Sequence, residues 1–291
     1  MELFRWETSP WGQQGILGIS WDLLWLFLAV ALLFVAGHAL YAWRRPARGK
    51  TQAAGSTRRE KASPERVVRH PLPARLFHWT MAASMLALVA TAFLPVTGVK
   101  FAWVVPHWIA GLVLLASVLF HVVHALVWQD VRSIWFDRRD LELARLSLRR
   151  LVGRPGEAPA KPGKYPVANK AFHLMVTVAG LVVIATGLLM TRRVETPLWP
   201  RDPYFLEGAA KAAVYVLHGL AAVAFVGLIV GHVYFAIRPE NLWITRSMIR
   251  GWITRSEYLG HHDPARWPVP AGETAARRRS AGRQRSRSEE V

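Results

Sequence analysis

The chain has 291 residues, of which 52% are hydrophobic, and a formal net charge of +18. Its apolar residues are gathered into long uninterrupted stretches, which indicates a membrane protein rather than a basic nucleic-acid-binding domain. It contains no cysteine. This excludes iron–sulfur clusters held by thiolates, covalently attached c-type haem and disulfides.

Five apolar stretches approach or exceed the roughly 20 residues needed to cross the hydrocarbon core of a bilayer. They lie at 20–43, 76–95, 107–128, 171–191 and 212–237. Between and around them, lysine plus arginine number one in 1–19, ten in 43–75, one in 96–106, ten in 128–170, four in 192–211 and eleven in 238–291. By the positive-inside rule, this alternation predicts a multi-pass protein of the bacterial inner membrane with a periplasmic N-terminus and a cytoplasmic C-terminus.

We therefore predict an all-α integral membrane bundle of five transmembrane helices, in which one N-terminal helix precedes a four-helix unit. The expected parts are the first helix with a short periplasmic segment at 1–43, a cytoplasmic linker at 44–70, the four-helix unit at 71–240, an interfacial segment at 241–270 and a disordered basic tail at 271–291. The tail is expected to contact anionic lipids.

Two further stretches have the amphipathic spacing of helices that lie along a membrane surface. The first, at 130–152, follows the third span, and the second, at 238–259, follows the fifth. We expect each to form one interfacial helix on the cytoplasmic side.

Histidines recur inside the spans at regular intervals. His107 and His121 lie fourteen residues apart in the third span, and His218 and His232 lie fourteen apart in the fifth. At about 1.5 Å and 100° per residue, fourteen steps advance about 21 Å along a helix and return to within about 40° of the same face. Each helix thus offers one ligand in each leaflet.

Two imidazoles from facing helices are a common axial ligand set for haem iron, and a helical bundle can supply such a set in each leaflet. His107 with His218 is the evident outer pair. The inner partner of His232 is open at this point among His78, His121 and His124, which all lie toward the cytoplasmic side.

Five short motifs resemble, in this order, those of the cytochrome b (gamma) subunit of respiratory formate dehydrogenases. They are RHPLPARLFHWT at 69–80, PHWIAG at 106–111, GKYPVANKAFH at 163–173, VLHGLAAVAFVGLIVGHVYFA at 216–236 and HHDPARW at 261–267. The sequence departs from the family at Pro166, where the loop typically reads Gly-Lys-Tyr-Asn, and its first helix is absent from the shortest members.

The resemblance implies a cytochrome with two b haems, the inner one held by His78 and His232 and the outer one by His107 and His218. It also implies reduction of membrane quinone beside the inner haem, with Asn169 and His232 as the contacts to consider. The implied partners are a periplasm-facing iron–sulfur subunit and a catalytic dehydrogenase subunit. The chain itself shows no substrate-oxidising site, so we expect an electron-transfer subunit.

Two alternatives accompany this interpretation. A hydrogenase or another molybdenum oxidoreductase could donate to the same kind of cytochrome. A haem-free transporter or anchor could use intramembrane histidines for a metal ion or a proton relay, although no Asp or Glu lies deep in the spans. The adjacent His261 and His262 do not predict a metal site, because two neighbouring residues cannot easily face one ion.

Overall fold

A computed structural model of the chain describes residues 2–8, 11–44, 66–151 and 160–269. The helices are α1 (Asp22–Arg44), α2 (Leu72–Phe93), α3 (Val104–Trp128), α4 (Arg138–Leu151), α5 (Val167–Thr191), α6 (Gly208–Ile237), α7 (Leu242–Arg250) and α8 (Arg255–His261). The strands are β1 (Phe4–Thr8), β2 (Gln14–Ile19), β3 (Arg66–Val68) and β4 (Trp252–Thr254). Short 3₁₀ turns lie at Pro95–Thr97, Val131–Ile134 and Pro239–Asn241.

These elements form two compact units. The first unit comprises Met1–Pro46, Leu76–Val123 and His173–Ala236, and the second comprises Ala47–Arg75, His124–Phe172 and Ile237–Val291. The first unit thus holds the hairpin of β1 and β2 and most of the long apolar helices. The second holds the short helices, β3, β4 and the ends of α2, α3, α5 and α6.

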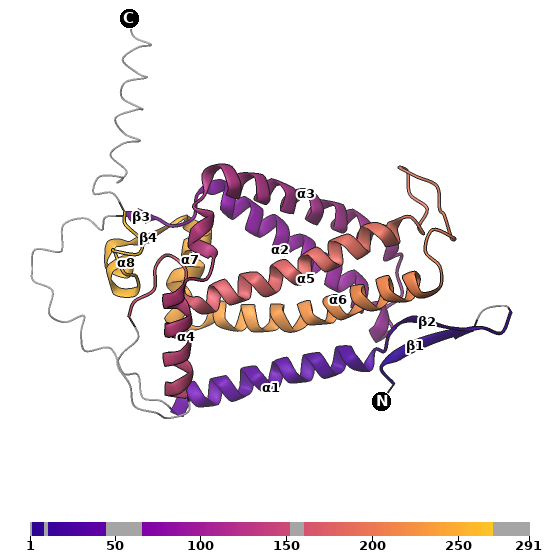
Figure 1. Cartoon of the computed structure of the whole chain (residues 1–291), viewed down its shortest axis with the longest axis horizontal. Coiled ribbons are helices and arrows are strands. Elements are labelled where there is room, and N and C mark those ends of the chain that lie inside the picture. The colour runs from indigo at the N-terminus through magenta and orange to yellow at the C-terminus, as the bar shows by residue number, and fades with distance from the viewer. Residues whose placement is uncertain (1, 9–10, 45–65, 152–159, 270–291) are drawn as a thin grey trace, which may run out of the picture. The chain divides into compact units, whose positions relative to one another are not determined.

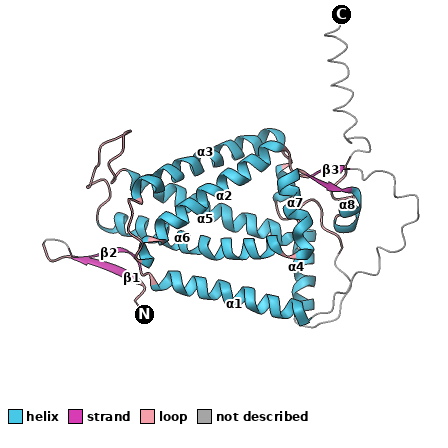
Figure 2. Cartoon of the chain, turned by 180° about the vertical axis from the view of Figure 1, so that it is seen from behind, coloured by secondary structure: helices cyan, strands magenta, loops and turns pink. Residues whose placement is uncertain are grey.

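Five of the described helices, α1, α2, α3, α5 and α6, are long and apolar enough to cross a membrane. Their parts in the first unit run side by side in the opposite views of Figure 1 and Figure 2. The prediction of a five-helix membrane bundle is therefore confirmed. α5 begins earlier than the apolar stretch suggested, because the carbonyl of Pro166 accepts hydrogen bonds from the backbone amides of Asn169 at 3.0 Å and Lys170 at 3.1 Å.

An apolar cluster packs the four-helix unit. Met85 of α2, Leu114 of α3 and Phe225 of α6 form a buried cluster, against which Val183 of α5 packs. Because lipid tails are as apolar as these side chains, close packing rather than exclusion of water holds such helices together.

The added helix α1 packs along α6. Its first residues, Leu23 and Leu24, form a buried cluster with Val223 and Ile19. A Cβ on Gly219 would lie 2.8 Å from Cγ1 of Ile19, so the close approach at this end requires glycine. The first helix is therefore an integral part of the first unit.

The segment before α1 is a β-hairpin, which the sequence analysis did not predict. β1 and β2 pair antiparallel with an irregularity between Arg5 and Trp6. The Arg5 side chain donates from Nε to the carbonyl of Ile19 at 2.8 Å, and its guanidinium lies 4.1 Å from the centre of the Trp21 ring. An ion pair between Glu7 and Lys211 ties the hairpin to the start of α6.

The prediction of a single interfacial helix at 238–259 was wrong. The segment forms α7, then β4, then α8, because Gly251 adopts a left-handed φ of 89° and ends α7. Thr254 then starts α8 with a capping box, its side chain accepting from the backbone of Glu257 while the Glu257 carboxylate accepts from the backbone of Thr254.

Within the second unit β4 pairs antiparallel with β3, with Val67 opposite Ile253. These two residues, Trp243 and Tyr258 form its buried apolar cluster. The predicted linker therefore ends in a strand. Its residues 45–65 and the predicted tail at 271–291 lie outside the described residues. In the other stretch expected to be helical, 130–152, the helix is confirmed over Arg138–Leu151 as α4.

Candidate haem-binding site

The structure brings the four predicted histidines together as two facing pairs within the first unit. The rings of His78 on α2 and His232 on α6 have centroids 6.1 Å apart and planes inclined by 56°. The rings of His107 on α3 and His218 on α6 have centroids 6.4 Å apart and planes inclined by 63°. One helix, α6, thus contributes a histidine to both pairs, and two different helices supply the partners.

Two threonines orient the outer pair. Thr91 Oγ1 lies 2.8 Å from Nδ1 of His107, and Thr186 Oγ1 lies 2.9 Å from Nδ1 of His218. Each hydroxyl donates its hydrogen to a carbonyl of its own helix, Thr91 to Ala87 at 2.7 Å and Thr186 to Val182 at 2.5 Å. The imidazole Nδ1–H groups must therefore donate to the hydroxyls, which leaves the lone pair on Nε2 of both rings.

These threonines were missed by the sequence analysis, although a signal was present. Thr91 follows His78 by thirteen residues on α2, and Thr186 follows His173 by thirteen residues on α5. Each is preceded by alanine. α2 and α5 thus carry the same spacing between a histidine and an Ala-Thr pair.

The geometry of both pairs fits a six-coordinate haem iron. Two imidazoles on opposite sides of one metal have ring centres about 6.4 Å apart, from two bonds of about 2 Å and about 1.2 Å from each nitrogen to its ring centre. The observed separations of 6.1 Å and 6.4 Å match this value. Rings in direct hydrogen-bond contact would lie closer together.

Two features beside His107 also suit a flat carboxylate-bearing group. A Cβ added to Gly111, one turn further along α3, would meet no described atom within 4 Å. The indole Nε1 of Trp108 is buried and has no acceptor among the described residues. Haem carries propionate carboxylates, which are acceptors of the kind a buried N–H requires.

His121 and His124, the alternatives to His78 as partner of His232, make other contacts. The ring of His121 stacks on Phe77 of α2, with centroids 4.0 Å apart and planes inclined by 11°. His124 accepts at Nδ1 from the side-chain amide of Gln129 at 2.9 Å and stacks on Trp128. Of the three candidates among the described residues, His78 is the one whose ring faces the ring of His232.

Asn169, the predicted quinone contact, lies in the first turn of α5 with an exposed side chain. It belongs to the second unit, whereas His232 belongs to the first. Pro166 is the residue at which the sequence departs from the family pattern. It directly precedes α5, and its carbonyl accepts the hydrogen bonds described above. The loop can therefore enter α5 without the family asparagine, since proline is well accommodated at a helix N-terminus.

The loop before Asn169 is held by the C-terminal motif. His262 is fully buried, and its Nδ1 donates to the carbonyl of Gly163 at 2.7 Å. Its Nε2 accepts from Arg69 Nη1 at 2.7 Å, and Arg69 Nη2 donates to the carbonyl of Lys164 at 3.3 Å. The backbone amide of Asp263 donates to the carbonyl of Pro162 at 2.9 Å. His262 is thus a structural residue that fixes the loop.

Burial lowers the pKa of His262 to about 4, assisted by the positive charge of Arg69 and opposed by the hydrogen bond to Gly163. Burial also lowers the pKa of Arg69 to about 10. At neutral pH the ring is therefore neutral and the guanidinium charged. These are the protonation states that the hydrogen bond between them requires.

An ion-pair network anchors the same region to α4. Lys170 Nζ donates to Asp140 Oδ2 at 2.6 Å, and Arg266 Nη2 donates to Asp140 Oδ1 at 3.2 Å. The Asp140 side chain is 1% exposed and that of Lys170 is 6% exposed. Burial alone would raise the pKa of Asp140, but the hydrogen bonds from Lys170, from the Asp137 backbone and from Arg266 lower it below its ordinary value. None of these partners was predicted from the sequence.

Two other histidines have clear surroundings. Nδ1 of His38 on α1 lies 2.9 Å from the hydroxyl of Tyr234 on α6. The His38 ring also packs edge-on against Phe235. It therefore helps to join α1 to α6. His173 is exposed near the start of α5.

Comparison with known proteins identifies a cytochrome family and relatives that share most of this chain's length. The family model described as prokaryotic cytochrome b561 matches residues 69–251, a segment that contains both histidine pairs. The formate dehydrogenase cytochrome b556 subunit of Haemophilus influenzae is 24% identical over 225 residues, which cover 72% of this chain and 84% of the relative. The cytochrome b556(fdo) subunit of formate dehydrogenase from Escherichia coli is 25% identical over 215 residues, covering 69% and 91%.

Proposed function

Because the chain belongs to the prokaryotic cytochrome b561 family, we propose that it is the membrane cytochrome b subunit of a formate dehydrogenase-like complex and delivers electrons to membrane quinone. The observation that carries this proposal is the presence of two histidine pairs at the spacing required for axial ligation. The names of the Haemophilus influenzae and Escherichia coli relatives support formate dehydrogenase as the partner.

The four histidines hold two b haems, one between His78 and His232 and one between His107 and His218. Haem b, when bound, supplies reversible one-electron chemistry at a potential set by its ligands and surroundings. Thr91 and Thr186 hold the outer imidazoles in the tautomer that presents Nε2, and their hydrogen bonds raise the basicity of the ligands.

The two sites are placed to serve opposite sides of the membrane. His218 and His232 are fourteen residues apart on one continuous helix, a rise of about 21 Å. The charge distribution supports a periplasmic location for His107 and His218 and a cytoplasmic one for His78 and His232. This arrangement supports uptake of electrons from a periplasm-facing iron–sulfur subunit and delivery to quinone near the cytoplasm.

Quinone is expected beside the inner pair, with Asn169 and His232 as contacts. The loop that leads to Asn169 is held by His262, Arg69 and the network of Asp140 and Lys170. A fixed loop is useful here, since a reactive ring must be held in one orientation during reduction. The catalytic dehydrogenase subunit oxidises the substrate, so this chain acts as an electron-transfer subunit of the inner membrane.

The donor is tested in membranes that contain the assembled complex. Addition of formate should reduce the b-type absorbance bands anaerobically, and addition of a soluble quinone should reoxidise them. His218→Ala removes the entry haem and should abolish reduction by formate. In His232→Ala formate should still reduce the outer haem, but quinone should no longer reoxidise it. Reduction by hydrogen but not by formate would assign the chain to a hydrogenase, and bands that respond to neither donor would overturn the proposed electron route.

A further inference from the structure

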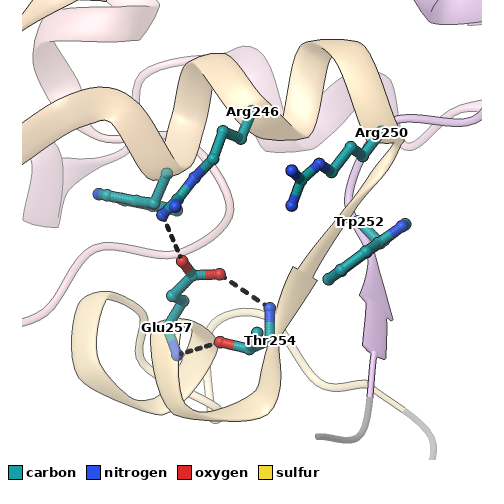
Figure 3. Close-up of a pocket in the computed structure, with 6 residues that line it drawn as sticks. Arg246, Arg250, Trp252, Thr254 and Glu257 are labelled. Atoms are coloured by element: carbon teal, nitrogen blue, oxygen red, sulfur yellow. Dashed lines mark hydrogen bonds and ion pairs between the residues drawn. The ribbon is translucent and has the colours of Figure 1, made fainter.

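The second unit contains a small hollow between α7 and the turn from β4 into α8 (Figure 3). It is lined by Trp243, Arg246, Arg250, Trp252, Thr254 and Glu257. The side chains of Arg246 and Arg250 extend from α7 toward the side of the hollow where Glu257 and Thr254 lie (Figure 3). None of its lining residues belongs to a histidine pair.

The carboxylate in the hollow is already engaged. Glu257 Oε1 accepts from Arg246 Nη2 at 3.0 Å, and Glu257 Oε2 accepts from the backbone amide of Thr254 at 2.9 Å as part of the capping box. Arg250 instead lies 5.9 Å from the centre of the Trp252 ring. Within the described ranges no carboxylate lies within ion-pair distance of Arg250. The lining therefore carries an excess of positive charge.

Two more guanidinium groups strengthen this excess. Arg66 lies 4.2 Å from the centre of the Trp252 ring, and the buried Arg69 lies 5.0 Å from the centre of the Trp243 ring. Arg66, Arg69 and Arg250 thus each lie against an indole that lines the hollow. The lining contains one carboxylate, which pairs with Arg246. Positive charges gathered around one site repel one another, and a bound anion reduces the repulsion.

The position of α7 identifies the kind of anion. α7 begins at Leu242, shortly after the span α6 ends at Ile237. Leu242 and Ile249 are 41% and 59% exposed, and seven residues bring them to the same face of a helix. An exposed apolar stripe beside arginines, directly after a span, is typical of a helix in the membrane interface.

We propose that this hollow, which we call the α7 pocket, binds the phosphate of an anionic phospholipid. Arg250 and Arg246 donate to the phosphate oxygens, since guanidinium groups form strong charge-assisted hydrogen bonds with phosphate. The acyl chains extend over Leu242 and Ile249. The α7 pocket is distinct from the histidine pairs, and lipid binding there does not depend on the proposed electron route.

The test uses the full-length chain purified with its haem in detergent. Native mass spectrometry measures retention of phosphatidylglycerol and, separately, of zwitterionic phosphatidylcholine. The wild type should retain one phosphatidylglycerol in preference to phosphatidylcholine. Arg250→Gln should weaken this retention about tenfold, the effect of losing one charged hydrogen bond. The double variant R246Q/R250Q should lose the preference altogether.

Arg145→Gln is the matched control, because Arg145 is an exposed arginine of α4 and the change in net charge is the same. It should retain phosphatidylglycerol as the wild type does. Arg250→Lys keeps the charge and should recover part of the retention. Equal loss in R145Q and R250Q would overturn the proposal, as would wild-type retention in R246Q/R250Q. Saturation of the site by inorganic phosphate alone, with no added retention of lipid, would also overturn it.

Discussion

Thr186 Oγ1 accepts a hydrogen bond from Nδ1–H of His218, across 2.9 Å between α5 and α6. The contact fixes which nitrogen of His218 faces His107. Replacement by Thr186→Val removes the acceptor and makes the ligand less electron-donating. We expect the midpoint potential of the outer haem to rise by about 40 mV, which corresponds to loss of about 1 kcal/mol in the oxidised state. Potentiometric titration followed optically measures this shift.

Thr186→Ser is the control for that experiment, because serine keeps the hydroxyl. The midpoint potential of its outer haem should lie within about 10 mV of the wild-type value. This is well below the shift of about 40 mV expected for one lost hydrogen bond. If valine and serine at this position give the same potential, the hydrogen bond has no influence on the ligand.

The position of α1 can be checked with a disulfide. A Cβ on Gly227 of α6 would lie 3.9 Å from Cβ of Ala31 on α1, close to the mean Cβ separation of about 3.8 Å in disulfides. The chain has no cysteine of its own, so A31C/G227C should oxidise to a single intramolecular bridge. Alkylation of the unfolded chain before and after reduction, measured by mass, detects it.

Leu33→Cys combined with Gly227→Cys is the negative control. Leu33 is 72% exposed on α1, two residues further along the helix and therefore on another face. This pair should remain reduced under the same conditions. Efficient cross-linking of the control pair, or failure of the first pair, would contradict the packing of α1 on α6.

The buried ion pair of Lys170 and Asp140 should be costly to break. Asp140→Asn leaves the ammonium of Lys170 without its carboxylate, and we expect a loss of about 3–5 kcal/mol in the stability of this region. Differential scanning fluorimetry should show a lower Tm. Glu142→Gln, at an exposed position of α4, should leave the Tm unchanged. The double change K170M/D140L removes both charges and should recover most of the loss.

The pH dependence of stability follows from His262. The unfolded ring gains a proton near pH 6.5, whereas the folded ring stays neutral until about pH 4 because it is buried. Between these values the unfolded chain binds more protons, so acidification from pH 6.5 to 4 should lower the Tm. His262→Gln should reduce this slope. Some slope should remain, since burial lowers the pKa of His261 as well.

Much of the fold followed from the sequence for simple reasons. Hydropathy and the distribution of Lys and Arg determine where a chain can cross a bilayer, so five spans were predictable. The fourteen-residue intervals from His107 and from His218 supplied candidates for both leaflets. Spacing alone could not choose between His78 and His121, because both lie near the same end of neighbouring helices. The structure separates them by stacking His121 on Phe77.

Other features depend on contacts that periodicity does not encode. The helix expected at 238–259 is interrupted at Gly251, whose added Cβ would lie 2.9 Å from the carbonyl oxygen of His70. That contact comes from a distant segment, so helical spacing could not reveal it. The hairpin of β1 and β2 was likewise hidden, because its short strands carry aromatic residues that also suit membrane anchors. In the sequence, Asp140 and Lys170 resemble surface charges, because their ion pair depends on the contact between α4 and α5.

The central claim is that His78, His107, His218 and His232 hold two b haems. The most direct test is haem quantification by pyridine haemochrome, together with EPR, on the purified wild type and on single alanine variants of these residues and of His121. We predict two low-spin haems in the wild type and in His121→Ala. Each of the other four variants should lose one haem or convert it to high spin. One haem or none in a folded wild type, or loss on changing His121 but not His78, would contradict the assignment.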